Sequence, residues 1–224
     1  MCGRYTLYDT AHFRDAFRVD KNTQLDLKDN YNVSPGQYMP VITSDGIGKQ
    51  LSLMKWGFIP PWTKDISKGY KPINAKSETA FESPMWRSAI LHHRCLVPSH
   101  GFYEWQVQED GKTKVPYFIY PKYNQLFSFA GLYSTWKDVE GKDIQSFTIM
   151  TTEPNKEMAP IHDRMPVILT PGEETNWLSP HNDNRERLEP LLHPYHDNGL
   201  EMYKVSSDVN SPRNNDKNLV QALI

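Results

Sequence analysis

The chain has 224 residues, and its 25 lysines and arginines are nearly balanced by 27 aspartates and glutamates, giving a formal net charge of −2. A general nucleic-acid binder is expected to be basic overall, so any DNA binding must come from a local patch. The length fits one domain with a sizeable core. No apolar run is long enough for a membrane-spanning helix, and Asp9, Arg14 and Asp15 interrupt any signal peptide.

The first half of the chain indicates short, mixed elements. Phe13, Ala16 and Phe17 recur at helical spacing, which predicts an amphipathic helix over Thr10–Val19. Further along, we expect a turn at Tyr31–Gly36, strands at Met39–Thr43 and Gln50–Trp56, and an irregular proline-rich segment at Trp56–Trp62. A helix is expected to begin at Ser77 and to break near Pro84, with Trp86, Ala89 and Ile90 on one face of its second part.

The second half of the chain is mostly β. Asp110-Gly111 suits a hairpin turn between two of the expected strands. The strands are expected at Arg94–Pro98, Phe102–Val107, Tyr117–Tyr120, Leu126–Tyr133, Ser146–Thr152, Met165–Leu169 and Glu201–Ser206, with helices near Gly172–Leu178 and Asn184–Leu192 and a loop at Asp208–Lys217. Together these elements predict a single α+β domain over residues 2–224, with a mostly antiparallel, curved or barrel-like β-sheet core and short peripheral helices.

Cysteine usage indicates a reducing environment. The chain has two cysteines, Cys2 and Cys95, which are too few for a disulfide framework, so we expect a cytoplasmic protein. Neither a C-x-x-C nor an H-x-x-x-H pair occurs, and we therefore expect no metal and no other cofactor. Cys95 lies in an apolar run and is interpreted as a small core residue.

The N-terminus carries a distinctive chemistry. A small second residue such as Cys2 permits removal of Met1, which would leave a thiol and a free α-amine on adjacent carbons. Such a 1,2-aminothiol condenses with an aldehyde to a Schiff base, and its thiol then closes a thiazolidine ring. The two groups titrate near neutral pH in model peptides. Alternatively, Cys2 is retained without a role behind an uncleaved Met1.

Two further segments offer polar side chains. Asn74 precedes the helix expected at Ser77 and offers both donors and acceptors, but a capping network around Ser77 is the better interpretation of this segment alone. Glu104 lies on an aromatic strand and shares a face with Phe102. Burial there would raise its pKa and suit it to proton transfer, whereas a Glu on an edge strand would simply face solvent.

His162 and a basic stretch complete the candidates. His162 lies between Ile161 and Asp163 just before an apolar strand, either as a functional loop residue or as part of a salt-bridge cluster. The stretch from Trp86 to Tyr103 has two arginines, three histidines and no acid. It suits a stacking surface for single-stranded nucleic acid, but a solvated helix face with core tryptophans is the better interpretation of this stretch alone.

Taken in order, these segments resemble the SRAP family of abasic-site processing proteins, which shield damaged single-stranded DNA. The resemblance rests on Met1–Arg4, Tyr31–Gly36, Trp56–Phe58, Ile73–Thr79, Gly101–Trp105 and Ile161–Pro166, and it extends from Cys2 to the region 205–210. It implies a DNA-damage enzyme with lyase-like chemistry that captures the ring-opened abasic-site aldehyde through Cys2 as a thiazolidine crosslink. A role in the SOS response and association with the nucleoid during DNA damage are implied as well.

The resemblance also implies roles for individual residues. Asn74 would hold Cys2 and the sugar, Glu104 would move protons, and His162 would assist sugar opening and reversal. Arg4, Lys76, Arg164 and Trp62 would contact the DNA strand. The family often has Arg where this chain has Lys76, and Lys lacks the bidentate geometry of Arg toward phosphate.

Three functions remain open at this point. The first is covalent protection of single-stranded DNA that contains abasic sites, by a monomer. The second is a thiol peptidase or autoprocessing hydrolase in which Glu104 and His162 assist Cys2, although no sequence feature marks the oxyanion site that it needs. The third is a non-catalytic single-stranded DNA binder in which Cys2 has no role, and the acidic charge balance keeps that function open.

Overall fold

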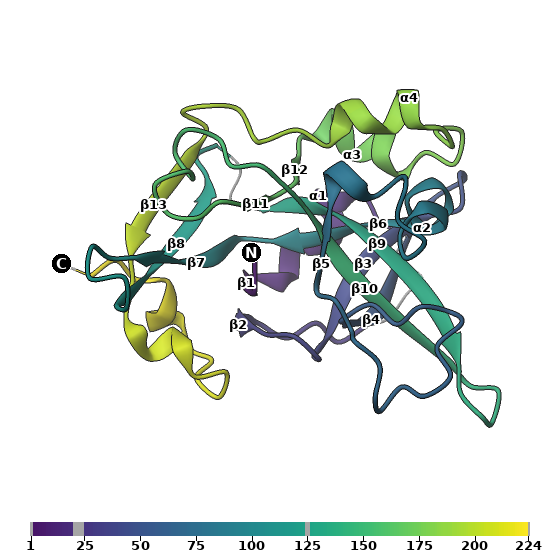
Figure 1. The fold of residues 1–224 in the computed structure, drawn as a ribbon, viewed down its shortest axis with the longest axis horizontal. Helices are drawn as coiled ribbons and strands as arrows, with labels where there is room; N and C mark the ends of the chain where they lie inside the picture. The colour runs from purple at the N-terminus through teal and green to yellow at the C-terminus, as the bar shows by residue number, and fades with distance from the viewer. Residues whose placement is uncertain (1, 20–24, 124–125, 224) are drawn as a thin grey trace.

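The computed structural model describes residues 2–19, 25–123 and 126–223. Its strands form two sheets, which Figure 1 shows side by side. The first is five-stranded and has the order β13-β8-β7-β1-β2, with each pairing antiparallel. In that order, its strands are Leu200–Lys204, Lys114–Pro121, Gly101–Val107, Arg4–Leu7 and Asn30–Val33. The N-terminal strand β1 therefore lies inside a sheet, with a partner on each side.

The second sheet closes on itself. Its order is β11-β10-β4-β3-β6-β9-β12, and β9 also pairs with β10, so the five strands from β10 to β9 form a closed barrel. The short strand β5 adds to β10 in parallel, as β4 does. These strands are β3 Tyr38–Ser44, β4 Lys49–Trp56, β5 Asn74–Lys76, β6 Arg94–Ser99, β9 Phe127–Lys137, β10 Asp143–Thr152, β11 Met165–Pro166 and β12 Ile168–Leu169.

The helices are short and lie around the sheets (Figure 1). A capping box formed by Thr170 and Glu173 begins α3, and Asn184 caps α4 through the backbone N–H of Arg187. The α-helices are α1 Phe13–Phe17, α2 Arg87–His92, α3 Pro171–Leu178 and α4 Arg185–Leu188, and the 3₁₀ helices are η1 Thr10–His12, η2 Ser77–Thr79, η3 Glu189–Leu191, η4 Ser207–Asn210 and η5 Lys217–Val220. The expected α+β architecture with a barrel-like core is confirmed.

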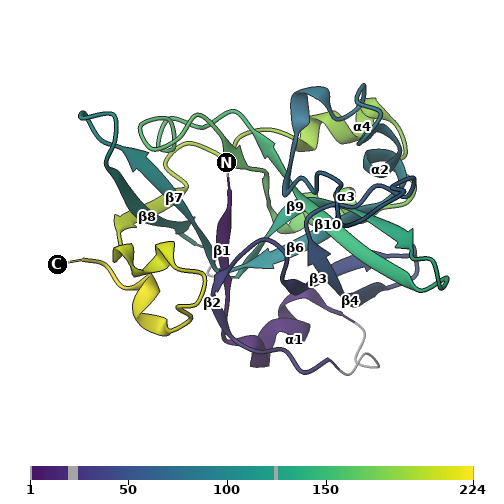
Figure 2. The same cartoon turned by 60° about the horizontal axis from the view of Figure 1, so that its bottom comes forward.

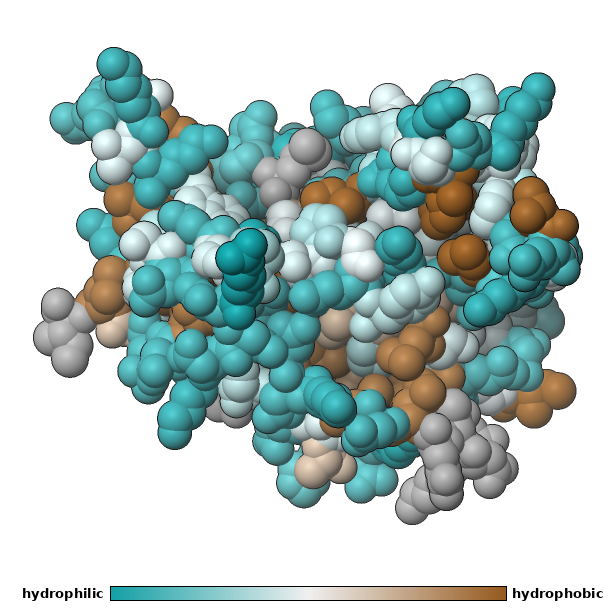
Figure 3. All heavy atoms as spheres, turned by 90° about the horizontal axis from the view of Figure 1, so that it is seen from below, coloured by the Kyte–Doolittle hydropathy of each residue, from teal (hydrophilic) through white to brown (hydrophobic). Residues whose placement is uncertain are grey.

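Successive side chains of β7 point to opposite faces of the sheet and pack into two different hydrophobic cores. Phe102 belongs to the main core and packs edge-to-face on Phe129 of the barrel, with ring centroids 5.9 Å apart. Tyr103 points the other way, into a smaller cluster with Phe118 and Val209. Figure 3 shows that the face seen from below is largely hydrophilic, with smaller hydrophobic patches. Because Phe102 and Tyr103 pack into different cores, strand β7 is held in place on both of its faces.

Buried Arg94 ties the peripheral helices to the barrel. Its guanidinium donates to the carbonyl oxygens of Ile90, Leu91, Trp177 and Ser179, which lie at the ends of α2 and α3. Orphan carbonyls at helix C-termini need such donors. The basic stretch from Trp86 to Tyr103 therefore forms no continuous surface, because Arg94 and His100 are both buried. Trp86 is a core residue, as the alternative interpretation of this stretch expected.

Several expected boundaries were wrong. The first part of the helix expected from Ser77 is only the single 3₁₀ turn η2, whereas its second part, after the break near Pro84, is confirmed as α2 with Ala89 and Ile90 buried. Asn74 belongs to strand β5 rather than to a helix start. The turn expected at Tyr31–Gly36 begins as strand β2. The strand expected at Met165–Leu169 is divided into β11 and β12, and the loop expected at Asp208–Lys217 includes most of η4. The Thr10–Val19 helix is η1 followed by α1, which ends where Arg18 adopts a left-handed conformation.

Candidate functional site

Cys2 lies just before β1 and is fully buried. Its Sγ is 3.9 Å from the carbonyl oxygen of Arg4. Burial raises the pKa of the Cys2 thiol well above its usual range, and the negative charge of Glu104 raises it further. The thiol is therefore held as S–H at neutral pH. It needs a nearby proton acceptor before it can act as a nucleophile.

Asn74 contacts the same residue from the opposite sheet. Strand β5 runs parallel to β10, with Asn74 paired to Ile149, and this register directs the Asn74 amide toward β1. Its Nδ2 donates to the carbonyl oxygen of Cys2 at 3.0 Å. Its Oδ1 is buried and has no hydrogen-bond partner among the residues that the structure describes. A buried acceptor of this kind is normally satisfied, so it is available to a donor.

Glu104 is the third member of the site. Strand β7 pairs with β1 through Arg4 and Tyr103, which places the next residue, Glu104, beside the N-terminal end of β1. The side chain is 3% exposed, and this burial raises the pKa of Glu104, an effect that the positive charge of His162 partly offsets. The carboxyl group therefore remains protonated at a higher pH than a free glutamate does.

His162 lies in the connection between β10 and β11. Its Nδ1 accepts the backbone N–H of Arg164 at 3.0 Å and is 2.8 Å from Oδ1 of Asp163. The first contact requires an unprotonated Nδ1, whereas a protonated Nδ1 would donate to Asp163. One ring nitrogen thus has two partners that suit its two protonation states.

Glu104 and His162 open onto one pocket of about 470 Å³, lined also by Trp105, Lys114 and Asn210. Trp105 donates its Nε1–H to Oδ1 of Asn210 at 2.7 Å, which fixes this wall. Sequence analysis did not single out Lys114 of β8 or Asn210 of η4, because only the folding of the chain brings these segments to Glu104. The structure places all four expected catalytic residues around the N-terminal end of β1.

The expected DNA contacts are arranged differently. Lys76 is exposed at the end of β5, whereas two arginines have partners inside the protein. Arg4 donates to Oδ1 of Asn32 at 2.7 Å and to the carbonyl oxygens of Val209 and Asn210. Arg4 is thus connected to η4, which lies beside β2 in Figure 2.

Arg164 and Trp62 occupy two further positions. The Arg164 guanidinium makes a bidentate ion pair with Glu78, at 2.5 and 2.9 Å, and donates to the carbonyl oxygen of Thr151. Trp62 is 60% exposed and lines a separate small pocket with Phe58 and Tyr133. Trp62 is therefore not part of the pocket that Glu104 and His162 share.

The whole architecture has known relatives. The family model described as SOS response associated peptidase (SRAP) matches residues 1–212 of the chain. The chain belongs to the SRAP family. Members of the SRAP family with similar sequences include the abasic site processing protein YoqW of Bacillus subtilis, which is 45% identical over 99% of this chain and 100% of its own length.

The likeness extends to eukaryotes and to a solved structure. The abasic site processing protein HMCES of Xenopus tropicalis is 33% identical, over 87% of this chain and 66% of that protein. A crystal structure of a protein from Bacteroides thetaiotaomicron superposes with a TM-score of 0.90 at 30% identity and covers all of both chains. Among the described residues, no helix is long and apolar enough to cross a membrane, and no group of three His, Cys, Asp or Glu side chains is placed to hold a metal ion.

Proposed function

We propose that this protein processes abasic sites in single-stranded DNA by capturing the ring-opened aldehyde on the aminothiol of Cys2. The observation that carries the proposal is the convergence of Asn74, Glu104 and His162 on the end of β1, with Asn74 bonded to Cys2. The names of the SRAP relatives from bacteria and eukaryotes support the same substrate. Met1, which this chemistry requires to be removed, lies outside the described residues.

The chemistry proceeds in two condensation steps. The α-amine of Cys2 adds to the aldehyde carbon, and Glu104, as the neutral acid favoured by its burial, protonates the resulting hydroxyl so that water leaves. The thiol of Cys2 then adds to the C=N carbon, and its proton passes to the Glu104 carboxylate. Overall, an aldehyde and an aminothiol give a thiazolidine and one water molecule.

His162 and Asn74 position the reacting groups. Asn74 fixes the Cys2 carbonyl through Nδ2, and its buried Oδ1 offers an acceptor to the α-amine or to the sugar hydroxyl. His162 serves as the second proton carrier, for opening of the sugar ring and for reversal of the adduct. Both roles depend on side chains that are already in position before the substrate binds. This preorganisation lowers the barrier to each proton transfer.

Phosphates of the strand are proposed to meet Lys76, Arg4 and Arg164. Lys76 is exposed beside Asn74, and Arg4 is two residues from Cys2. Trp62 is proposed to support a flanking part of the strand from its separate pocket. The formal net charge of −2 means that binding must rely on this local group of cations and must weaken with added salt.

The test is denaturing electrophoresis of the protein with single-stranded DNA that carries one abasic site. A band that survives denaturation is expected with the aldehyde and is expected to be lost with borohydride-reduced sugar and with Cys2→Ala. The matched control is Cys95→Ala, which removes the other buried thiol and should retain the band. A persistent band in Cys2→Ala would overturn the assignment. Strand binding without any band would favour the non-catalytic binder.

A second activity, hydrolysis of the peptide bond before Cys2, is favoured by the description of the matched family as a peptidase. Intact mass after cell-free synthesis without an aminopeptidase tests it. Loss of Met1 in the unmodified protein, but not in Glu104→Gln, would support self-processing. Retention of Met1 in both proteins would assign its removal to a separate aminopeptidase.

A further inference from the structure

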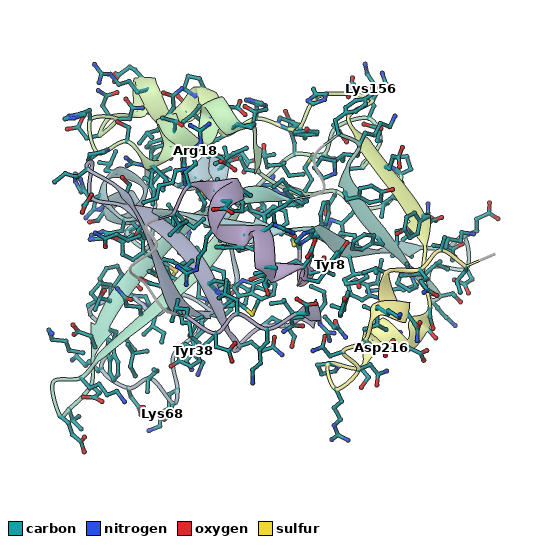
Figure 4. All side chains as sticks on the ribbon, turned by 180° about the vertical axis from the view of Figure 1, so that it is seen from behind. Tyr8, Arg18, Tyr38, Lys68, Lys156 and Asp216 are labelled. Carbon is teal, nitrogen blue, oxygen red and sulfur yellow. The ribbon has the colours of Figure 1, made fainter. Side chains whose placement is uncertain are left out.

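A second pocket lies at the other end of β1, away from Cys2. It has a volume of about 220 Å³ and is lined by Tyr8, His100, Phe118, Tyr120 and Tyr203. Tyr8 is six residues from Cys2, which corresponds to about 20 Å along an extended chain. Tyr8 is labelled in Figure 4, where the molecule is seen from behind. None of the proposed catalytic residues lines this pocket, so it is a separate site.

Aromatic rings form the walls of this pocket. The rings of Phe118, Tyr120 and Tyr203 contact one another, with centroids 5.7 to 6.0 Å apart. Tyr8 stacks on His100 with centroids 4.2 Å apart. The Phe118 ring reaches its place because Gly101 has no side chain, since a Cβ there would lie 2.2 Å from the ring. The absence of a side chain at Gly101 therefore makes room for Phe118 in the pocket wall.

The polar atoms of the pocket offer lone pairs. Tyr120 donates its hydroxyl hydrogen to Oε2 of Glu201, and Tyr203 donates its own to the carbonyl oxygen of Val220, each at 2.7 Å. Both phenol oxygens are therefore left as acceptors. His100 accepts the backbone N–H of Tyr8 through Nδ1, and burial lowers the pKa of His100 to about 4, so its ring is neutral at pH 7.

The charges around the pocket are negative. Glu201 is bonded to its rim, and Asp9 and Asp29 are close enough to favour a proton on His100 against the effect of burial. Among the described residues that line the pocket, none is a lysine or an arginine. A phosphate group would be repelled here, whereas a cation would gain from the carboxylates and from the aromatic rings that line the pocket.

We propose that the pocket lined by Tyr8, His100, Phe118, Tyr120 and Tyr203 binds an alkylammonium group, of the kind carried by lysine and N-methylated lysine side chains. Its ring walls attract the cation, its phenol oxygens can accept an N–H bond where the ammonium carries a hydrogen, and its volume is small compared with sites for drug-sized ligands. A head group on a narrow stem fits this space better than a nucleotide does. The site does not depend on the proposed abasic-site chemistry.

The test is a titration of the ¹⁵N-labelled protein, followed by NMR, with free Nε-trimethyl-lysine. The matched probe is its neutral isostere, in which a tert-butyl group replaces the trimethylammonium group. The amide signals of Tyr8, Tyr120 and Tyr203 are expected to shift, and the isostere is expected to bind about fivefold more weakly. Equal binding of the two probes, or shifts confined to residues elsewhere, would overturn the proposal.

Two variants test separately what the aromatic walls and the Glu201 carboxylate contribute to binding. Tyr203→Leu is expected to abolish the shifts, and Glu201→Gln, which keeps the size of the side chain, is expected to weaken binding about threefold. The control Tyr123→Leu changes a tyrosine that is 90% exposed and outside the pocket, and it should bind as the unmodified protein does. Unchanged binding in Glu201→Gln would contradict the electrostatic argument even if Tyr203→Leu failed to fold.

The same titration identifies the source of the ammonium group. Tighter binding of trimethyl-lysine within a short peptide than of the free amino acid would identify a protein side chain as the ligand. Equal binding of both would identify a small free amine. Cys2→Ala should bind each probe as the unmodified protein does, so failure of the abasic-site chemistry and failure of this site are distinguishable.

Discussion

The Asn74 side chain bonds to the carbonyl oxygen of Cys2 across 3.0 Å and thereby joins the barrel to the N-terminal strand of the other sheet. The contact links two residues 72 positions apart. It holds the backbone of Cys2 near the buried carboxyl group of Glu104. The precision of the site therefore depends on how the two sheets are docked, because neither sheet contains all of the members.

Replacing Asn74 with Asp tests this link. The change keeps the size of the side chain but removes the N–H donor and sets a carboxylate against the Cys2 carbonyl. We expect covalent capture of an abasic strand to slow by about tenfold, since a hydrogen bond to a positioned group is worth about 1 kcal/mol and the new repulsion adds to its loss. Single-turnover electrophoresis measures the rate. The exposed Asn176→Asp on α3 makes the same change elsewhere and should react normally.

Glu78 would compete with the phosphate that is proposed to bind Arg164. Its two carboxylate oxygens occupy the fork of the guanidinium, which is the geometry that a phosphate would use. Replacing Glu78 with Gln is expected to tighten binding of undamaged single-stranded DNA by about three- to tenfold at low salt, as measured by fluorescence anisotropy. Glu82→Gln removes the same charge from the partner of Arg185 and is the control. An equal gain in both variants would show a general charge effect.

Glu104 is expected to lower stability at neutral pH. Burial raises its folded-state pKa, so the folded protein binds its proton more tightly than the unfolded chain does. Stability is therefore lost as the pH rises from the unfolded pKa of about 4.3 to the folded one. Glu104→Gln should melt at a higher temperature than the unmodified protein at pH 7, by about 2–4 °C for each kcal/mol gained. The difference should vanish at pH 4, and a lower Tm at pH 7 would contradict the argument.

Arg94 is expected to support the fold rather than DNA binding. Arg94→Lys keeps the charge but cannot reach four carbonyl oxygens on two helices, and we expect a loss of about 2–3 kcal/mol. Urea unfolding measures this loss. Arg87→Lys at the exposed start of α2 should change stability by less than about 0.5 kcal/mol. An unchanged midpoint in Arg94→Lys would mean that the carbonyl bonds are replaced by water.

Local patterns predicted the long strands well and the short elements poorly. Alternation placed Phe102 and Tyr103 on opposite faces of β7, as the two cores show. Three-residue β5 has no periodicity of its own and exists because β10 offers it an edge. Asparagine is typical of turns, which is why a turn was predicted at Asn32. The residue lies in strand β2 instead, where its Nδ2 donates to the carbonyl oxygens of Val209, Ser211 and Asn214.

The chemistry of Cys2 and Glu104 suggested each residue separately, but their grouping into one site was predictable only through the resemblance to the SRAP family. No spacing in the sequence connects Cys2, Asn74 and Glu104, which the sheet docking brings together. The burial of Arg94 and the pairing of Arg164 with Glu78 also follow from tertiary contacts. A charged residue in a sequence does not reveal whether its partner will be solvent, a ligand or another part of the chain.

The bonds from Arg4 to the backbone of Val209 and Asn210 have a consequence for timing. They span 205 positions, so they form only after nearly the whole chain has been synthesised. At ribosomal speeds of about 5–20 residues per second, that interval is on the order of 10–40 s. During this time β1 also lacks its partner β7 until midway through synthesis. The start of the chain thus remains accessible to a processing enzyme until the segment that contains Val209 and Asn210 has been synthesised and can bind Arg4.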